Sequence, residues 1–270
     1  MQESHISPHP DRLSVVAAVI LLAYALLPFV QSPARQIAFE LFGVAVDFQL
    51  NYSLLISIIA AALAAAGTDW LVRDHPKRGD KPVLPHYLLP ALTGWVLGIP
   101  LGLIQVSIQW WVVFALGGLL LLGVLIAEFI SIDAADIRYP LAVMILTAVG
   151  YGLILTTTIA VRAAGMRLYL LLITLVPVYA LISLRIVHLR SGGKWLLEWA
   201  IAITLVVSQV AIGLHYWPLS PIRYGLILLG LTYAFINLAI SQQVRPISRN
   251  AVIESLAMLG IFWLAAVILK

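Results

Sequence analysis

Residues 110–130 read WWVVFALGGLLLLGVLIAEFI, with Glu128 as their single charged side chain. An α-helix crosses the hydrocarbon core of a bilayer with roughly 20 mostly apolar residues, so this stretch predicts one membrane-spanning helix. Because backbone groups in lipid must be hydrogen-bonded internally, and because the alternating pattern of a barrel strand is missing from these residues, the helix is favoured over a β-strand. This segment therefore predicts a helical membrane protein.

Eight further apolar runs predict eight more spans, so the expected fold is an all-α, polytopic transmembrane bundle of about nine spans. They cover approximately residues 13–30, 52–71, 86–104, 139–161, 168–187, 195–214, 222–240 and 251–269. The composition agrees, since 62% of the residues are hydrophobic and 10% are charged, whereas a soluble domain is about a quarter charged. Short connections use the remaining length, so we expect one membrane-embedded domain, residues 1–270.

The basic residues predict how the chain is oriented. With a cytoplasmic N-terminus, eleven of the sixteen lysines and arginines fall on the cytoplasmic side and five outside. Cytoplasmic loops of membrane proteins carry this excess, so we expect residues 1–12 and a basic loop at 72–85 in the cytoplasm and the C-terminus outside. The same bias explains the net charge of +4. No basic stripe with interleaved aromatic residues is present, so nucleic acid is not an expected partner.

Residues 32–50 are too polar for a span, although they join the first two. Ser32-Pro33 is typical of a helix start, and Glu40 and Asp47 are seven residues apart, which places them on one face of a helix. The sequence therefore predicts an interfacial helix on the outer surface of the membrane.

Small residues predict where helices pack closely. Gly94, Gly98 and Gly102 recur every four residues in the third span, and Ala60 and Ala64 give the second span a similar small face. Such spacing lets helix backbones approach each other. Structural packing is the favoured interpretation, and a bent helix that lines a cavity is the functional alternative.

Asp69 and His86 are candidate catalytic residues because they fall near the cytoplasmic ends of consecutive antiparallel spans. A hydrogen-bonded carboxylate and imidazole would suit proton transfer. The favoured alternative is that Asp69 pairs with Arg73 at i,i+4 and that His86 extends to the lipid headgroups.

Asp133 and Asp136 are the candidate metal ligands. Two carboxylates at this spacing would hold Mg²⁺ bridging to a diphosphate, as the richer aspartate motifs of intramembrane prenyl transferases do. The favoured alternative is a solvated loop with an Asp–Arg pair near a helix start. No cofactor is identified otherwise, and Mg²⁺ is expected only under an enzymatic function. Without cysteine, thiolate sites are excluded.

Two more carboxylates lie near predicted helix starts that face the cytoplasm. Glu198 follows Lys194 at i,i+4, and Glu254 follows Arg249. Charge pairing at the interface is the favoured interpretation for both. Glu254 is nearer the hydrocarbon and is the third catalytic candidate, since an intramembrane carboxylate is costly and often functional.

The motifs Gly67-Thr68-Asp69-Trp70-Leu71 and Pro85-His86-Tyr87-Leu88-Leu89-Pro90-Ala91-Leu92 resemble a pattern from an uncharacterised family of bacterial multi-pass membrane proteins. The resemblance covers roughly residues 60–100. It implies a bacterial cytoplasmic (inner) membrane and carries no known activity.

These observations predict a non-enzymatic carrier or accessory subunit for lipid or another apolar small molecule, with membrane lipids and other membrane proteins as partners. The first alternative is a cytoplasm-facing lipid- or isoprenoid-modifying enzyme that uses the Asp133 and Asp136 motif. The second is a proton-coupled transporter that uses Glu198 or Glu254.

Overall fold

The computed structural model describes residues 9–30, 35–41, 44–50, 52–73, 75–77, 79, 83–243 and 249–269 of the 270-residue chain. Within this part, nine helices are long and apolar enough to cross a membrane, which confirms the predicted helical bundle. Asp74 and Asp80 of the predicted basic loop at 72–85, and most of the N-terminal segment 1–12, lie outside the described residues.

The chain divides into two compact units, where the sequence predicted one domain. Unit 1 is Met1–Asp133 and unit 2 is Ala134–Lys270. No change in composition marks the boundary, because every span is apolar for the same reason. Unit 1 contains α1 (Pro10–Ala25), η1 (Leu27–Phe29), β1 (Arg35–Leu41), β2 (Val44–Leu50), α2 (Tyr52–Arg73), α3 (Leu84–Leu103) and α4 (Ile108–Ile130). Unit 2 contains α5 (Tyr139–Ala163), α6 (Leu168–Arg190), α7 (Leu197–His215), α8 (Pro221–Ser241) and α9 (Arg249–Ile268).

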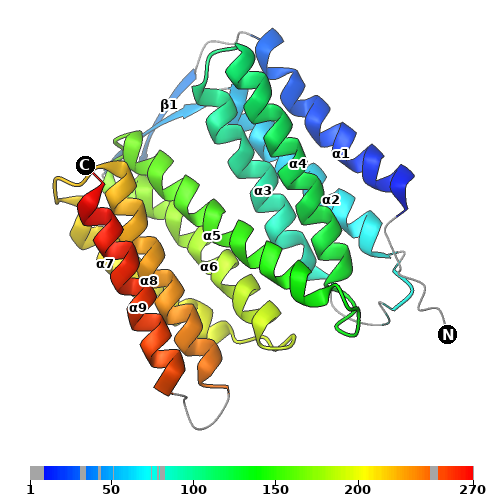
Figure 1. Ribbon diagram of the computed structural model, residues 1–270. Helices are drawn as coiled ribbons and strands as arrows, with labels where there is room; N and C mark the ends of the chain where they lie inside the picture. Colours follow the sequence, from blue (N-terminus) through cyan, green and yellow to red (C-terminus); the bar gives the residue numbers. More distant parts are fainter. Residues whose placement is uncertain are drawn as a thin grey trace. The chain divides into compact units, whose positions relative to one another are not determined.

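Unit 1 is organised around α2 and α3, which make the most extensive contact between any two helices of the described residues (Figure 1). The glycines of α3 face α2: a Cβ atom added at Gly94 would lie 3.0 Å from the carbonyl oxygen of Ala60 and 3.3 Å from the Cα of Ala61. One at Gly98 would collide with Ser57, and one at Gly102 with Ser53. Only residues without a Cβ allow the two backbones to come this close.

A hydrogen bond joins α1 to the same contact. The hydroxyl of the fully buried Tyr24 donates to the carbonyl oxygen of Gly94. The phenol is thus satisfied inside the apolar core, where an unpaired hydroxyl would be costly. The first three helices therefore meet at one glycine of α3.

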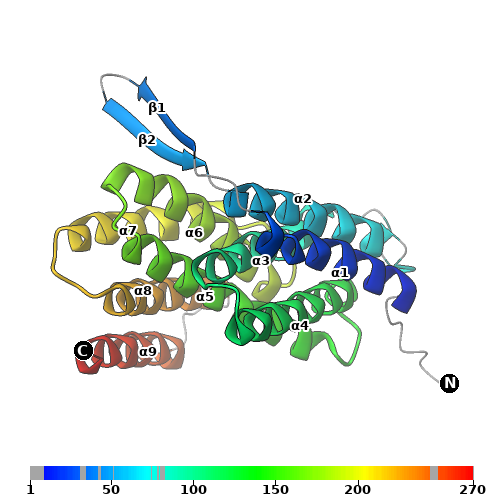
Figure 2. The ribbon, with the colours of Figure 1, turned by 90° about the horizontal axis from the view of Figure 1, so that it is seen from above.

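The predicted interfacial helix at 32–50 is wrong, because β1 and β2 form an antiparallel hairpin there (Figure 2). Both segments, RQIAFEL and VAVDFQL, alternate apolar and more polar residues, which is the period of a strand and not of a helix.

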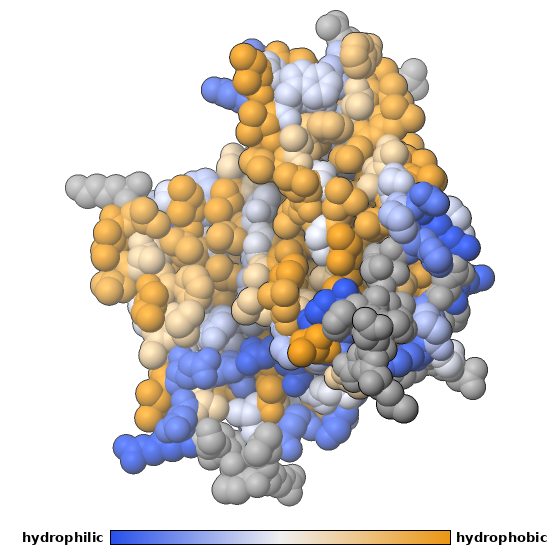
Figure 3. Space-filling model, turned by 45° about the vertical axis from the view of Figure 1, so that its right-hand side comes forward, coloured by the Kyte–Doolittle hydropathy of each residue, from blue (hydrophilic) through white to orange (hydrophobic). Residues whose placement is uncertain are grey.

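In unit 2, α8 packs against α5, α6, α7 and α9, and α6 packs against α5 and α7. The flanks of the spans carry exposed apolar side chains, among them Leu116 and Leu119 of α4 and Val267 of α9. Figure 3 shows apolar residues covering most of one face, with hydrophilic residues gathered in patches toward its lower part. This distribution is the one expected of helices that are solvated by lipid.

Candidate functional site

Asp69 lies on the last turn of α2 and is engaged from two sides. Its Oδ2 is 2.7 Å from the Nε of Arg73, which is the i,i+4 pair expected by the alternative interpretation. Its Oδ1 accepts a hydrogen bond from the hydroxyl of Tyr87, on the first turns of α3. The carboxylate therefore ties the end of α2 to the start of α3, and the structure does not pair it with His86.

The partner of His86 is Glu128 of α4. The Nδ1 of His86 and the Oε2 of Glu128 are 2.9 Å apart, and their side chains are 12% and 0% exposed. A carboxylate that is completely removed from solvent is costly unless it is hydrogen-bonded and its charge is balanced. This pair links α3 to α4 within unit 1.

Ser131, just after α4, completes the arrangement around this pair. Its hydroxyl donates to the carbonyl oxygen of Glu128 at 2.9 Å, and its Oγ lies 3.4 Å from both Glu128 Oε2 and His86 Nδ1. In a Ser–His–acid relay the acid contacts one ring nitrogen and the serine the other. Here both contacts fall on Nδ1, so the group lacks the geometry of an activated serine nucleophile.

Glu128 was not among the candidate site residues, although its position in the sequence carries a signal. It is the only charged side chain in residues 110–130, and an ionisable residue inside a span usually has a specific partner. His86 was a candidate, but the expected partner was Asp69 on the preceding span and not Glu128 on the following one.

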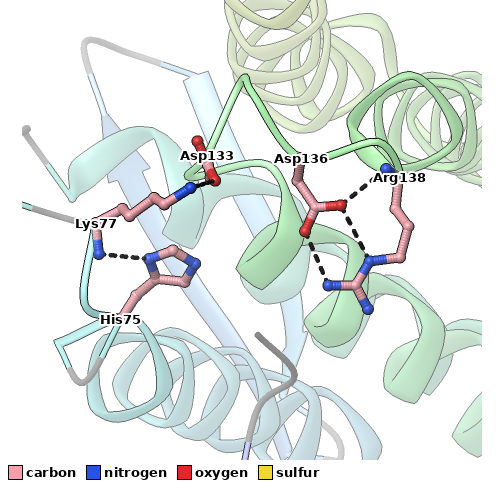
Figure 4. Close-up of polar contacts among 5 residues, drawn as sticks. All are labelled: His75, Lys77, Asp133, Asp136 and Arg138. Carbon is pink, nitrogen blue, oxygen red and sulfur yellow. Dashed lines mark hydrogen bonds and ion pairs between the residues drawn. The ribbon is translucent and has the colours of Figure 1, made fainter. Parts of the chain in front are cut away.

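Asp133 is held by the loop that follows α2 (Figure 4). The Nζ of Lys77 is 2.7 Å from its Oδ2, and the backbone N–H of Lys77 donates to the Nδ1 of His75 at 3.2 Å. The buried His75 ring in turn packs edge-on against Phe129, with the ring centroids 4.6 Å apart. These contacts fasten residues 75–77 to the end of α4.

Asp136 belongs to unit 2 and binds Arg138 in a bidentate manner, as Figure 4 shows. Its Oδ2 accepts from Nη2 at 2.8 Å, and its Oδ1 accepts from Nε at 3.1 Å and from the backbone N–H at 2.8 Å. The adjacent carboxylate raises the pKa of the Arg138 guanidinium above its ordinary value. The pair lies just before α5. This arrangement agrees with the favoured interpretation of a loop with an Asp–Arg pair near a helix start.

The two candidate metal ligands are thus engaged by two different basic side chains. Each forms charge-assisted hydrogen bonds, which are stronger than neutral ones. Among the described residues, no three His, Cys, Asp or Glu side chains are grouped so that they could hold one metal ion.

Glu254 lies on α9 and is exposed, and its Oε1 accepts a hydrogen bond from the hydroxyl of Tyr233 of α8 at 3.0 Å. The hydroxyl of the next residue, Ser255, accepts a hydrogen bond from Nδ2 of Asn237 on α8 at 3.1 Å. The Nη2 of Arg190 on α6 donates to the Oδ1 of the same Asn237 side chain at 3.2 Å. A polar connection therefore runs from α6 through α8 to α9. Its central residue, Asn237, was not singled out in the sequence because a lone asparagine in an apolar run carries no motif.

Glu198 is exposed on the first turn of α7. Because α7 begins at Leu197, Lys194 precedes the helix, so the i,i+4 geometry that was expected to pair these two residues does not exist.

The nine apolar helices of the part of the chain that the structure describes define a multi-pass membrane protein. A family model described as a protein of unknown function, DUF5656, matches residues 32–269, and the chain belongs to this family. The match includes the hairpin and eight of the nine span helices and leaves out α1. No curated protein and no solved structure matches the chain. The expectation of an uncharacterised family is thereby confirmed.

Proposed function

We propose that this protein is a non-enzymatic carrier or accessory subunit that handles lipid or another apolar small molecule in a bacterial cytoplasmic membrane. One observation carries the proposal: three carboxylates that were candidates for chemistry are separately bound by side chains of the same chain. These pairs are Asp69 with Arg73 and Tyr87, Asp133 with Lys77, and Asp136 with Arg138.

Separate ion pairs favour a structural role for these residues. Acid–base or metal-assisted chemistry requires several groups directed at one reacting atom. Here each pair instead fixes a helix end or a loop, and Asp133 and Asp136 are directed at different cations. The lipid- or isoprenoid-modifying alternative therefore gains no support from this geometry.

Lipid handling is supported by the surface of the spans. Val267 and Ile268 of α9 and Leu205 of α7 are more than half exposed, so these helices present apolar surface to the bilayer along their length. Apolar molecules that partition into the membrane would reach the protein laterally, without a water-filled path.

The proposal is tested by native mass spectrometry of the protein extracted with its surrounding lipid. A stoichiometric polypeptide companion identifies an accessory subunit, and one retained lipid or small molecule identifies a carrier and the class of its cargo. The protein should keep the same companion after Asp133→Ala. A metal-dependent reaction that is abolished by Asp133→Ala would overturn the proposal.

A second candidate function, proton-coupled transport, is favoured by the buried pair of Glu128 and His86. It moves the proton-carrying role from Glu198 and Glu254, both exposed, to a carboxylate shielded from solvent. His86 is slightly exposed and would pass a proton between the surface and Glu128. Ser131 adjoins the pair. Asp133, which follows α4, is bound by Lys77 from the segment after α2.

Infrared difference spectroscopy tests this second candidate without knowledge of a substrate. Under a pH change, the carbonyl band of a protonated carboxylic acid should appear in the wild type, vanish in Glu128→Gln and persist in Glu198→Gln. If the band is unchanged in Glu128→Gln, the candidate is lost.

A further inference from the structure

The hairpin of β1 and β2 has one apolar and one polar set of positions. In the register of the pair, Ile37 is opposite Phe48, Phe39 is opposite Val46, and Leu41 is opposite Val44. Successive residues of a strand alternate between the two faces of a sheet, so these six positions share one face. Arg35 and Leu50 extend this face at the base of the hairpin.

The opposite face has no large apolar position. It holds Gln36 opposite Gln49, Ala38 opposite Asp47, and Glu40 opposite Ala45. The hairpin is therefore amphipathic across its thickness, and the contrast is continuous over seven residues in both strands.

This apolar face needs a covering. The two strands form a sheet of their own, and neither packs extensively against α1, α2, α3 or α4 in the described part of unit 1. A solitary two-stranded hairpin is marginally stable in water and needs a further surface on its apolar side.

The connections of the hairpin join it to the ends of two helices that are long and apolar enough to cross a membrane. β2 ends at Leu50 and α2 begins at Tyr52, so about 7 Å at most separates the Cα atoms of these two residues. On the other side, η1 ends at Phe29, whose side chain is exposed at the end of the first span, and β1 begins at Arg35. The base of the hairpin is thus close along the chain to the end of the first candidate span and to the start of the second.

We propose that the β1–β2 hairpin lies in the headgroup region of the bilayer, on the side where α1 ends and α2 begins. Its apolar face covers acyl chains and its polar face meets water. Strands of seven residues are about 23 Å long, which suits an element that lies along the interface. The bilayer surface offers an apolar-to-aqueous gradient over roughly 5–10 Å, which matches the two faces of the hairpin.

The charges of the hairpin specify which lipid it contacts. Glu40 and Asp47 are on the polar face and a single basic residue, Arg35, is at the base. Attraction to anionic headgroups would require basic residues on the exposed side. The contact is therefore with acyl chains and zwitterionic headgroups, and it should form in vesicles that contain no anionic lipid.

Single-cysteine labelling tests the proposal, because the natural chain has no cysteine. Neighbouring residues of β1 (Phe39→Cys and Glu40→Cys) and of β2 (Val46→Cys and Asp47→Cys) are spin-labelled in phosphatidylcholine vesicles. Collision with oxygen, which concentrates in lipid, is compared with collision with a water-soluble nickel chelate. Labels at 39 and 46 should favour oxygen by several-fold, and labels at 40 and 47 should favour nickel.

Leu119→Cys on the exposed flank of α4 and Lys194→Cys in the exposed connection before α7 calibrate lipid and water. A lipid-type response at Leu119→Cys, retained when each hairpin cysteine is combined with it, shows that the fold is intact. If all four hairpin labels meet nickel, the hairpin is in water and the proposal fails. If the labels at 39 and 46 are protected from both reagents, a protein surface covers this face, and the proposal is equally overturned.

Discussion

Replacement of Gly94 by alanine should weaken unit 1 through the contact of α2 with α3. The new methyl carbon would lie 3.0 Å from the carbonyl oxygen of Ala60 and 3.3 Å from the Cα of Ala61. Both neighbours are backbone atoms, so no side-chain rotation relieves the contact and the helices must separate. Overpacking of this kind costs about 1–3 kcal/mol, and the higher helix propensity of alanine offsets about 0.5–1 kcal/mol. We expect a net loss of about 1–2 kcal/mol.

Gly123 provides the matched control. It lies in α4 of the same unit, and a Cβ atom there would have no atom within 4 Å. Gly123→Ala should therefore leave stability unchanged or raise it by up to about 1 kcal/mol. The free energy of unfolding would be measured for both variants by denaturant titration in mixed detergent–lipid micelles. Wild-type stability for Gly94→Ala, or an equal loss for Gly123→Ala, would refute the close approach of α2 and α3.

Three further perturbations test the polar pairs. Glu128→Leu should cost several kcal/mol in unfolding free energy, because the partly buried imidazole of His86 loses its hydrogen-bond partner. Glu128→Gln keeps an acceptor and should cost less than half as much in the same titration. Asp133→Asn should change thermal stability little, by about 0–1 kcal/mol, because Lys77 is more than half exposed; a loss above about 2 kcal/mol would contradict this. Ser255→Ala should cost about 0.6–1.7 kcal/mol by removing the acceptor of Asn237, and hydrogen exchange should then rise in α9 before α8.

Sequence reasoning succeeded where the solvent imposes the structure. A span such as Ile108–Ile130 is recognisable because lipid requires a long apolar run and internal backbone hydrogen bonds, and both demands are local. The glycine spacing of α3 was likewise readable, because close approach requires small residues every four positions on one helix face.

The hairpin shows how a local pattern was misread. Residues 35–41 and 44–50 alternate with period two, yet a plausible helix start at Ser32-Pro33 and the seven-residue spacing of Glu40 and Asp47 favoured a helix. The pairing of the strands, Ile37 with Phe48 for example, is a contact between segments. The spacing of charges along a single predicted helix contains no information about such a pairing.

The sequence by itself determined the class of this protein: its spans, its apolar surface and the small residues that let α2 and α3 approach. It did so because the composition of each segment must match the lipid around it. Only the tertiary structure decided that His86 contacts Glu128 and not Asp69, that Asp133 and Asp136 are held by different cations, and that the chain forms two compact units. Those outcomes depend on which helix ends meet in space. The hydropathy of a span does not reveal this, because it is the same whichever helices pack beside it.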